Sequence, residues 1–495
     1  MDRLADADVV QNYLADESGA FRARTEDVTA LCLPQTEADI VEIIGTANRD
    51  KTLVTISGGG TGITGSRVPM HGGWVLSCER YRTPISINAG AKRASLPPGI
   101  SLAELDSALP PALIYPPDPT EKSAFLGGSV ATNASGARCF NYGPTRNWIE
   151  GLRVVLGDGE VLDIRRGDHL AADGNLDLTS ESGKNYSLTL PTYKMPDVKN
   201  AAGVFSKDDM DSIDLFIGSE GIFGIFTEVR VKLEERPDMV SDIAFFKDSG
   251  DALAYADQAR SMRDRGLLSL EYFDANSLEF MRSEYPGIMD NLNAAVFTEF
   301  KRDGQLLSDI SESQARHKAC EDWCALTSAD ARDLKELRHA LPEGINTYLR
   351  EHESYKLGTD FVVPGDRFSE MLDHYQKAGQ GYKNRFRREG MHYLLFGHIG
   401  DHHLHFNFIT HTDEERQAAR NLYAELAAKA VELGGTVSGE HGVGKKTIRH
   451  EDREIPYLQL MYGEAGLREI ARVKKAFDPK GLLNVGNMIP MEYLL

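Results

Sequence analysis

Alternation of apolar and polar residues predicts a β-hairpin late in the chain. Residues 393–396 form an apolar run typical of a buried strand, whereas Leu404, Phe406 and Phe408 alternate with polar neighbours as on a half-buried strand. The Gly-Asp pair at residues 400–401 suits a two-residue turn between them. We therefore expect the two segments to pair directly.

Polar side chains gather on one face of this predicted hairpin. In that register His398 lies opposite His403, and His405 and Asn407 follow on the same side. Imidazoles brought together in this way form either a metal site or a surface histidine cluster, and the stretch alone leaves both readings open.

The same periodicities predict elements along the first half of the chain. A helix over residues 38–48 begins with a capping box, in which Thr36 is the cap and Asp39 its partner. An Asp-Gly turn predicts a hairpin over residues 154–162. We also expect strands at residues 51–57, 74–77, 215–217 and 227–233, a helix at 102–109, and an irregular polar stretch at 165–212.

From residue 240 short strands alternate with helices in an order that suits antiparallel pairing, which indicates an α+β domain. At 495 residues the chain is too long for one ordinary core. We expect domains at residues 1–237 and 238–433, followed by a C-terminal segment at 434–495. The expected elements are strands at 243–246, 267–273 and 294–300, and helices at 251–263, 275–282, 307–325, 330–350, 413–433 and 467–477.

A glycine-rich loop follows the strand at 51–57. Residues 60–65 match the dinucleotide fingerprint GxGxxG, but that fingerprint requires a helix to begin at the glycines. Pro69, Gly72 and Gly73 follow instead, so we reject a Rossmann fold. Backbone N–H groups of such a loop can still surround a phosphate as a nest, and an ordinary mobile loop is the alternative.

A second glycine-rich loop can complete a metal site with the hairpin. Catalytic metal sites usually take three protein ligands, and His398, His405 and Glu440 supply a His₂-carboxylate set. His441 would then not bind the metal. His403 is either a fourth metal ligand or a hydrogen-bond donor to one of the ligands. These ligands suit zinc, manganese or iron(II), and the sequence does not choose among them.

Composition excludes several classes of function. The formal charge is −20, which argues against a nucleic-acid partner because phosphate binding needs a basic surface. We see no signal peptide and no apolar run near the ~20 residues of a membrane span. The five cysteines show no zinc or iron–sulfur spacing, so we expect a cytoplasmic protein.

With these motifs in view, the chain resembles the flavin-dependent D-2-hydroxy acid dehydrogenases of the vanillyl-alcohol-oxidase fold superfamily. Those proteins include D-lactate and D-2-hydroxyglutarate dehydrogenases and the glycolate oxidase catalytic subunit. The matching pieces occur in family order over nearly the whole chain, which is more specific than any one motif. They are residues 34–36, 57–65, 116–119, 127–136, 218–221, 397–407, 438–445 and 477–484.

The resemblance implies an α+β fold with a two-subdomain FAD-binding domain at 1–237, an antiparallel-sheet substrate domain at 238–433, and a C-terminal segment that returns to the FAD domain. Non-covalent FAD is implied, because the glycine loop contains no histidine or cysteine for attachment, although Cys139 keeps the alternative open. The implied FAD-binding residues are Ser57, Gly58, Gly59, Gly60, Thr61, Gly62, Ile63, Thr64, Pro117, Asp118, Pro119, Gly127, Gly128, Thr132, Asn133, Ser135, Gly136, Tyr142, Gly143, Glu220, Gly221, Ile222 and Asn484.

The implied reaction is oxidation of a D-2-hydroxy acid to the 2-oxo acid, with hydride passing to the flavin and His441 as base. Arg338 and Lys356 lie where the family places cations for the substrate carboxylate, with Asn407 close by; an exposed helix arginine is the alternative for Arg338. Reoxidation needs an external acceptor such as a quinone, a cytochrome or an electron-transfer flavoprotein. The resemblance leaves open whether the protein forms a homodimer and whether it contacts a membrane peripherally.

The hairpin departs from the family pattern. Members of the family usually have Gly-Asp-Gly-Asn-Leu-His at this hairpin, whereas this chain has His402 and His403 at the third and fourth positions.

Three other functions compete with the implied one. They are a metallohydrolase built on the same ligands, a flavoenzyme of this fold that does not oxidise its substrate, and an inactive subunit of a larger complex.

Overall fold

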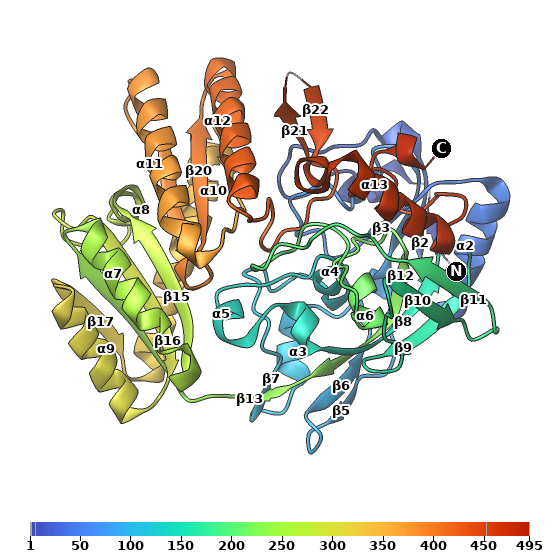
Figure 1. Cartoon of the computed structure of the whole chain (residues 1–495), viewed down its shortest axis with the longest axis horizontal. Helices are drawn as coiled ribbons and strands as arrows, with labels where there is room; N and C mark the ends of the chain where they lie inside the picture. Colours follow the sequence, from blue (N-terminus) through green and yellow to red (C-terminus); the bar gives the residue numbers. More distant parts are fainter. Residues whose placement is uncertain (1, 5, 452, 495) are drawn as a thin grey trace.

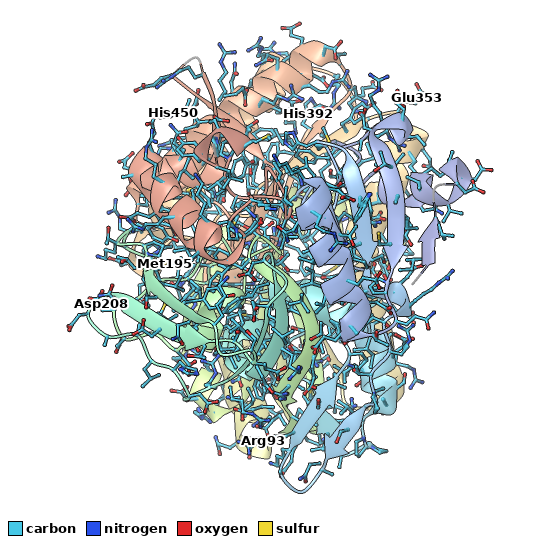
Figure 2. The ribbon with its side chains drawn as sticks, turned by 90° about the vertical axis from the view of Figure 1, so that its right-hand side faces the viewer. Arg93, Met195, Asp208, Glu353, His392 and His450 are labelled. Atoms are coloured by element: carbon cyan, nitrogen blue, oxygen red, sulfur yellow. The ribbon has the colours of Figure 1, made fainter. Side chains whose placement is uncertain are left out.

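The computed structural model describes residues 2–4, 6–451 and 453–494, and within these ranges the chain forms two α+β units that lie next to each other (Figure 1). The first, in blue to green, occupies the right of the view, and the second, in yellow to orange, occupies the left. Figure 2 shows Arg93 of the first unit and Glu353 of the second at opposite ends of the side view. No described helix is long and apolar enough to cross a bilayer.

The first unit contains two sheets. The smaller has the order β1-β2-β4-β3, in which β4 runs parallel to both β2 and β3. The larger is antiparallel, with the order β5-β6-β12-β8-β9. Their strands are β1 (Asp2–Leu4), β2 (Val28–Leu33), β3 (Val54–Ser57), β4 (Gly73–Ser77), β5 (Ser86–Asn88), β6 (Arg93–Leu96), β8 (Ile149–Leu156), β9 (Val161–Arg165) and β12 (Gly224–Lys232).

Two short ribbons and six helices complete the first unit. The ribbons are β7 (Leu113–Ile114) with β13 (Glu234–Glu235), and β10 (Asn175–Thr179) with β11 (Asn185–Thr189). The α-helices are α1 (Ala7–Val10), α2 (Glu37–Asp50), α3 (Leu102–Ala108), α4 (Leu126–Ala131), α5 (Cys139–Tyr142) and α6 (Ser212–Phe216). Single 3₁₀ turns are η1 (Gln11–Tyr13), η2 (Thr25–Asp27), η3 (Cys78–Arg80) and η4 (Thr145–Trp148).

Two predictions about this unit are confirmed. Helix α2 begins with the expected capping box, in which the Thr36 side chain accepts from the Asp39 N–H and the Asp39 carboxylate accepts from the Thr36 N–H. The glycine loop is followed by turns, and no helix occurs in residues 58–72, all of which are described. The rejection of a Rossmann fold therefore stands.

The second unit is an antiparallel sheet with the order β17-β14-β16-β15-β19-β20-β18. One face packs against α7, α9, α11 and α12, and the other against α8 and α10. Its elements are β14 (Met239–Phe246), α7 (Ser249–Arg260), η5 (Arg263–Arg265), β15 (Leu267–Asp274), α8 (Ala275–Met281), β16 (Ala294–Lys301), α9 (Gly304–Arg316), β17 (Glu321–Ala325), α10 (Ser328–Glu351), β18 (Tyr355–Gly358), η6 (Gly365–Arg367), α11 (Phe368–Arg385), β19 (Tyr393–His398), η7 (Ile399–Asp401), β20 (His403–Thr410) and α12 (Asp413–Glu432).

The helix predicted over residues 307–325 was wrong in its second half. Helix α9 ends at Arg316, and Lys318 then takes the left-handed conformation at φ 60°. The Cys320 N–H donates to the Phe245 carbonyl at 2.8 Å, and β17 follows as an edge strand. The strand begins with the charged residues Glu321 and Asp322, which are tolerated there because an edge strand has one free side.

Two predictions in the first unit were also wrong. Residues 215–217 lie at the end of helix α6 and just beyond it, because the Asp211 carboxylate caps the Ile213 N–H and starts a helix. All five residues of α6 are buried, so the sequence shows no amphipathic period. The stretch at 165–212 is not wholly irregular, since it contains the β10–β11 hairpin.

The C-terminal residues return to the first unit through β21 (Thr447–His450), β22 (Arg453–Pro456), α13 (Tyr457–Phe477) and η8 (Met491–Tyr493). A buried carboxylate, Glu220, fixes this return. It accepts the Val443 N–H at 2.8 Å and the Gly444 N–H at 2.9 Å, and it also accepts the Ser66 hydroxyl. Burial raises the pKa of Glu220 above its ordinary value, although these donors oppose the shift.

Replacing Glu220 tests this connection. Glu220→Ala leaves two buried N–H groups without an acceptor, and each such group costs about 1–3 kcal/mol, so we expect a loss of about 2–6 kcal/mol in unfolding free energy. Glu220→Gln keeps one acceptor oxygen and should lose less. Chemical denaturation followed by circular dichroism measures both, and a Glu220→Ala protein as stable as the wild type would contradict the assignment.

Candidate active site

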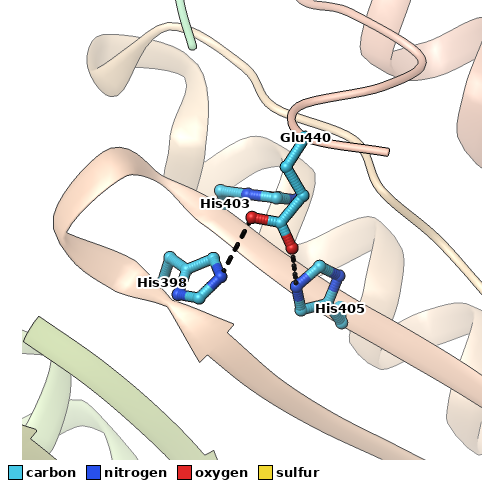
Figure 3. A group of neighbouring side chains, drawn as sticks. All are labelled: His398, His403, His405 and Glu440. Carbon is cyan, nitrogen blue, oxygen red and sulfur yellow. Dashed lines mark ion pairs between the residues drawn. The ribbon is translucent and has the colours of Figure 1, made fainter. Parts of the chain in front are cut away.

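The predicted hairpin forms with the expected register. His398 ends β19 and pairs with His403 at the start of β20, which continues to His405 (Figure 3). The turn differs from the prediction, because residues 399–401 form a 3₁₀ turn and His402 follows in the left-handed conformation at φ 55°. The imidazoles nevertheless gather as the alternation predicts.

Glu440 lies between two of these imidazoles. Its Oε2 is 3.2 Å from Nε2 of His398, and its Oε1 is 3.2 Å from Nε2 of His405 (Figure 3). The other ring nitrogens are held, since Nδ1 of His398 lies 2.6 Å from Glu271 Oε1 and Nδ1 of His405 lies 3.1 Å from the Thr359 carbonyl. Imidazoles held at Nδ1, with both Nε2 atoms turned toward one carboxylate, are typical of metal-ligating histidines, so this donor set fits a divalent ion.

Buried charges of both signs surround this group. The Lys199 ammonium lies 3.0 Å from Glu440 Oε2, with its side chain 3% exposed. Burial raises the pKa of Glu440, but Lys199 and His398 outweigh it and hold that pKa well below its usual range. Burial also lowers the pKa of His398, whereas Glu271 and Glu440 raise it more strongly, to about 9. Lys199 and Glu271 were not predicted, because the sequence stretches that carry them contain no motif.

Asp360 holds the loop that carries Glu440 and His441. Its Oδ2 accepts the Ser438 hydroxyl at 2.6 Å, the His441 N–H at 3.0 Å and the Glu440 N–H at 3.3 Å. The His441 ring places Nδ1 3.1 Å from the same oxygen. Burial raises the pKa of Asp360, but His441 and His403 hold it well below its ordinary value. Sequence reasoning missed this carboxylate, which stands alone in an apolar stretch.

The two histidines outside the family pattern have different surroundings. The His402 ring packs on Phe368, with ring centroids 5.2 Å apart, and burial lowers the pKa of His402 to about 4. His403 is fully buried, and burial lowers its pKa to about 3. Its Nε2 is 2.8 Å from Asp360 Oδ1 without hydrogen-bond alignment, and neither ring nitrogen has a hydrogen-bond partner. A ring nitrogen of His403 also lies within 4.8 Å of the ligand atoms of His398, His405 and Glu440.

A cavity of the first unit opens on this site. Glu440 and His441 line it together with the glycine loop and the start of α4. Pro98 and Phe125 line it as well, although no motif marks them. Sixteen of the residues implied by the family resemblance lie in its wall: Ser57, Gly58, Gly59, Gly60, Thr61, Gly62, Ile63, Thr64, Pro119, Gly127, Gly128, Thr132, Ser135, Glu220, Gly221 and Asn484.

The other seven implied residues lie outside the wall of this cavity and have neighbours of their own. The Asp118 carboxylate accepts the Arg138 N–H at 3.0 Å, and a Cβ on Gly136 would lie 2.2 Å from the Asp118 carbonyl oxygen. Asn133 accepts the Arg146 N–H at 2.9 Å. The seven are Pro117, Asp118, Asn133, Gly136, Tyr142, Gly143 and Ile222.

The three residues implied for substrate binding lie on or beside the second sheet. Arg338 is buried, not exposed, with Nε 3.7 Å from Glu271 Oε2. Lys356 of β18 pairs with Ile409, so it shares a sheet face with His405 and Asn407. The Asn407 amide donates to the His405 carbonyl at 3.1 Å and lies over Gly358, where a Cβ would come within 2.5 Å of its oxygen.

The chain matches two family models over these regions. Residues 28–165 match the model described as "FAD binding domain", and residues 237–488 match "FAD linked oxidases, C-terminal domain". The second match alone covers more than half of the chain.

Curated relatives match along most of their own length. A "Glycolate oxidase subunit GlcD" of Bacillus subtilis is 27% identical over 96% of this chain and 91% of its own. A "D-lactate dehydrogenase" of Anaerostipes hadrus is 28% identical over 98% and 94%. A "D-2-hydroxyglutarate dehydrogenase" of Xanthomonas citri is 28% identical over 94% and 90%.

Solved structures share the fold. A 4-ethylphenol oxidase from Gulosibacter chungangensis superposes with a TM-score of 0.67 at 16% identity, over 99% of this chain and 95% of the other. An alkyldihydroxyacetonephosphate synthase superposes with a TM-score of 0.66 at 17% identity, over 92% and 76%.

The cavity wall fits the cofactor that these matches imply. A Cβ built on Gly62 or Gly128 would meet no atom within 4 Å, so the backbone there borders open space that a ligand can fill. Backbone N–H groups in such loops favour phosphate. The chain therefore belongs to the FAD linked oxidases, has the vanillyl-alcohol-oxidase fold, and is an FAD-dependent oxidoreductase.

Proposed function

We propose that this protein oxidises a D-2-hydroxy acid to the 2-oxo acid, with FAD as hydride acceptor and a divalent ion beside it. One observation carries the proposal: Glu440, which lies between Nε2 of His398 and Nε2 of His405, lines the same cavity as His441 and the glycine loop. The names of three relatives, a glycolate oxidase subunit, a D-lactate dehydrogenase and a D-2-hydroxyglutarate dehydrogenase, support this substrate class.

The residues divide the chemistry among themselves. When bound, FAD supplies hydride acceptance and the metal supplies Lewis acidity toward an alcohol oxygen. His398, His405 and Glu440 would hold the metal, with zinc as first choice and manganese or iron(II) as alternatives. His441 would take the hydroxyl proton at Nε2, since its Nδ1 faces Asp360.

Cations near this site suit a carboxylate substrate. Lys356 is accessible to water yet surrounded by protein atoms, as expected for a group that lines a cleft. Burial, and then Lys446, lowers the pKa of Lys356, and no carboxylate of the described residues lies within ion-pair distance of its ammonium. We propose that Lys356, together with Arg338 and Asn407, binds the carboxylate end of the substrate.

An external acceptor would reoxidise the flavin, because the sequence encodes no haem or iron–sulfur motif. Two competing functions make different predictions. A metallohydrolase on the same ligands would not require the FAD-binding domain that the chain contains. A flavoenzyme that does not oxidise its substrate would bind a ligand without bleaching of the flavin.

Anaerobic titration of the FAD-loaded protein with D- and L-2-hydroxy acids tests the reaction. We expect a D-acid to bleach the flavin absorbance, and His441→Asn to keep FAD bound while the reduction rate falls about 10²–10⁴-fold, the usual contribution of a general base. If no 2-hydroxy acid bleaches the flavin, the proposed reaction is wrong. A wild-type reduction rate in His441→Asn would show that His441 is not the base.

Elemental analysis after dialysis tests the metal ligands. We expect about one equivalent of metal in the wild type and a loss of most of it in His405→Asn, because a three-ligand site loses one donor. His402→Asn is the matched control on the same hairpin and should retain the metal. Equal metal content in both variants would contradict the ligand assignment.

Lys356→Met tests the carboxylate site. A charged hydrogen bond contributes about 1.5–3 kcal/mol, so the dissociation constant of the bleaching acid should rise about 10–100-fold, with a smaller effect on the limiting reduction rate. Lys377→Met, an exposed lysine on α11, is the control. Stopped-flow reduction over a range of acid concentrations separates the two constants, and an unchanged dissociation constant would exclude Lys356.

A further inference from the structure

We propose that Asp360 is the positioning residue for His441. It fixes the tautomer and the direction of the imidazole, so that Nε2 is the nitrogen offered to the substrate. This inference rests on the proposed role of His441 as base, and it assigns a function to a carboxylate that no motif marks.

The geometry at Asp360 supports this role. Its Oδ2 receives the backbone N–H of His441 at 3.0 Å and lies 3.1 Å from Nδ1 of the same residue. The carboxylate therefore meets both the main chain and the ring of His441. Ser438 donates to the same oxygen at 2.6 Å, which restricts rotation of the carboxylate.

The chemistry of the pair selects one tautomer. An ionised carboxylate only accepts hydrogen bonds, so a neutral imidazole turns its protonated nitrogen to the nearer of two carboxylates. Nδ1 lies 3.1 Å from Asp360 Oδ2, whereas Nε2 lies 3.5 Å from Oε1 of Glu440, the proposed metal ligand. Nδ1 of His441 then bears hydrogen, and Nε2 keeps its lone pair. The Nε2 side points to the metal-ligand group, 3.5 Å from Glu440 Oε1, and the ring is 32% exposed and lines the cavity. The arrangement follows the logic of a base oriented by a buried acid.

The other oxygen of Asp360 faces a residue particular to this chain. His403 stands where the resembled family usually has asparagine, and its Nε2 lies 2.8 Å from Asp360 Oδ1. The His403 ring is fully buried against Gly439, where a Cβ would approach Nδ1 to 3.1 Å. Asp360 thus connects the hairpin, through His403, to the loop that carries the base.

Substitution at Asp360 tests the proposal by rate. Asp360→Asn keeps the shape but presents N–H groups that favour the opposite tautomer of His441. We expect flavin reduction to slow about 10²–10⁴-fold, while FAD content, metal content and the dissociation constant of the 2-oxo acid product stay within about threefold of wild type. Glu415→Gln is the matched control, because it neutralises a buried carboxylate that pairs with Arg388 and does not line the cavity, and its rate should stay within about threefold.

A spectroscopic measurement tests the tautomer directly. In ¹⁵N-histidine-labelled, FAD- and zinc-loaded protein, the resonances lost in His441→Asn should show a protonated Nδ1 and an unprotonated Nε2, and this order should reverse in Asp360→Asn. A protonated Nε2 in the wild type would overturn the inference. That spectrum decides the question even where Asp360→Asn fails to fold.

The outcomes separate this inference from the proposed function. If His441→Asn loses flavin reduction while Asp360→Asn remains fully active, the positioning role of Asp360 is rejected and the role of His441 as base stands. A fully active His441→Asn would reject the base itself. His403→Asn places the family residue beside the other oxygen of Asp360. Its rate should stay within about tenfold of wild type, because Nε2 of His403 is not aligned for a hydrogen bond to that oxygen, so its loss leaves the contacts of Oδ2 in place. An inactive His403→Asn with normal metal content would contradict the assignment of tautomer control to Asp360.

Discussion

The site depends on the buried contact between Glu220 and the loop at 441–445. Glu220 belongs to the first unit, and its carboxylate accepts main-chain N–H groups of Val443 and Gly444. The loop is thereby fixed against the glycine loop, whose Ser66 hydroxyl reaches the same carboxylate. Asn484 adds to the connection, because its amide donates to the Glu220 carbonyl at 2.7 Å. The cavity wall, the proposed base His441 and the proposed metal ligand Glu440 thus share one anchor.

Ion pairs buried between the two units support the same geometry. Arg138 of the first unit makes two hydrogen bonds, of 3.0 and 2.9 Å, to Glu299 of the second sheet. Lys199 of the first unit lies 3.8 Å from Asp401 of the second unit, and 3.0 Å from Glu440 of the C-terminal segment. Removal of one partner from a buried pair typically costs about 3–5 kcal/mol, because the other charge is left uncompensated. These pairs hold the sheet that carries the histidines against the cofactor cavity.

Local signals made much of this structure predictable. The alternation at 404–408 gave the strand and its register, and Thr36 with Asp39 gave the start of α2, because each depends on neighbours within a few residues. The error at residue 318 arose because a lysine in the left-handed conformation ended α9, which propensity does not reveal. The β10–β11 hairpin did have a signal, since Leu176 and Leu178 alternate with polar residues.

Residues that act through distant contacts were harder to find. His398, His405 and Glu440 stood out because histidines cluster in the sequence and a glycine-rich loop carries the glutamate. Asp360, Glu271 and Lys199 meet them only in the folded chain, each from a stretch without a motif. Their roles come from pairings between elements far apart in sequence, and a single sequence does not encode such pairings in any local pattern.

The proposed reaction requires that the metal held by His398, His405 and Glu440 and the flavin in the cavity act together on one substrate. Anaerobic flavin reduction by the bleaching acid, compared before and after removal of the metal with a chelator, tests it most directly. The account predicts that metal-depleted protein keeps its FAD, loses reduction by the acid, and recovers it when one equivalent of the ion is restored. Reduction at an unchanged rate without metal would contradict it.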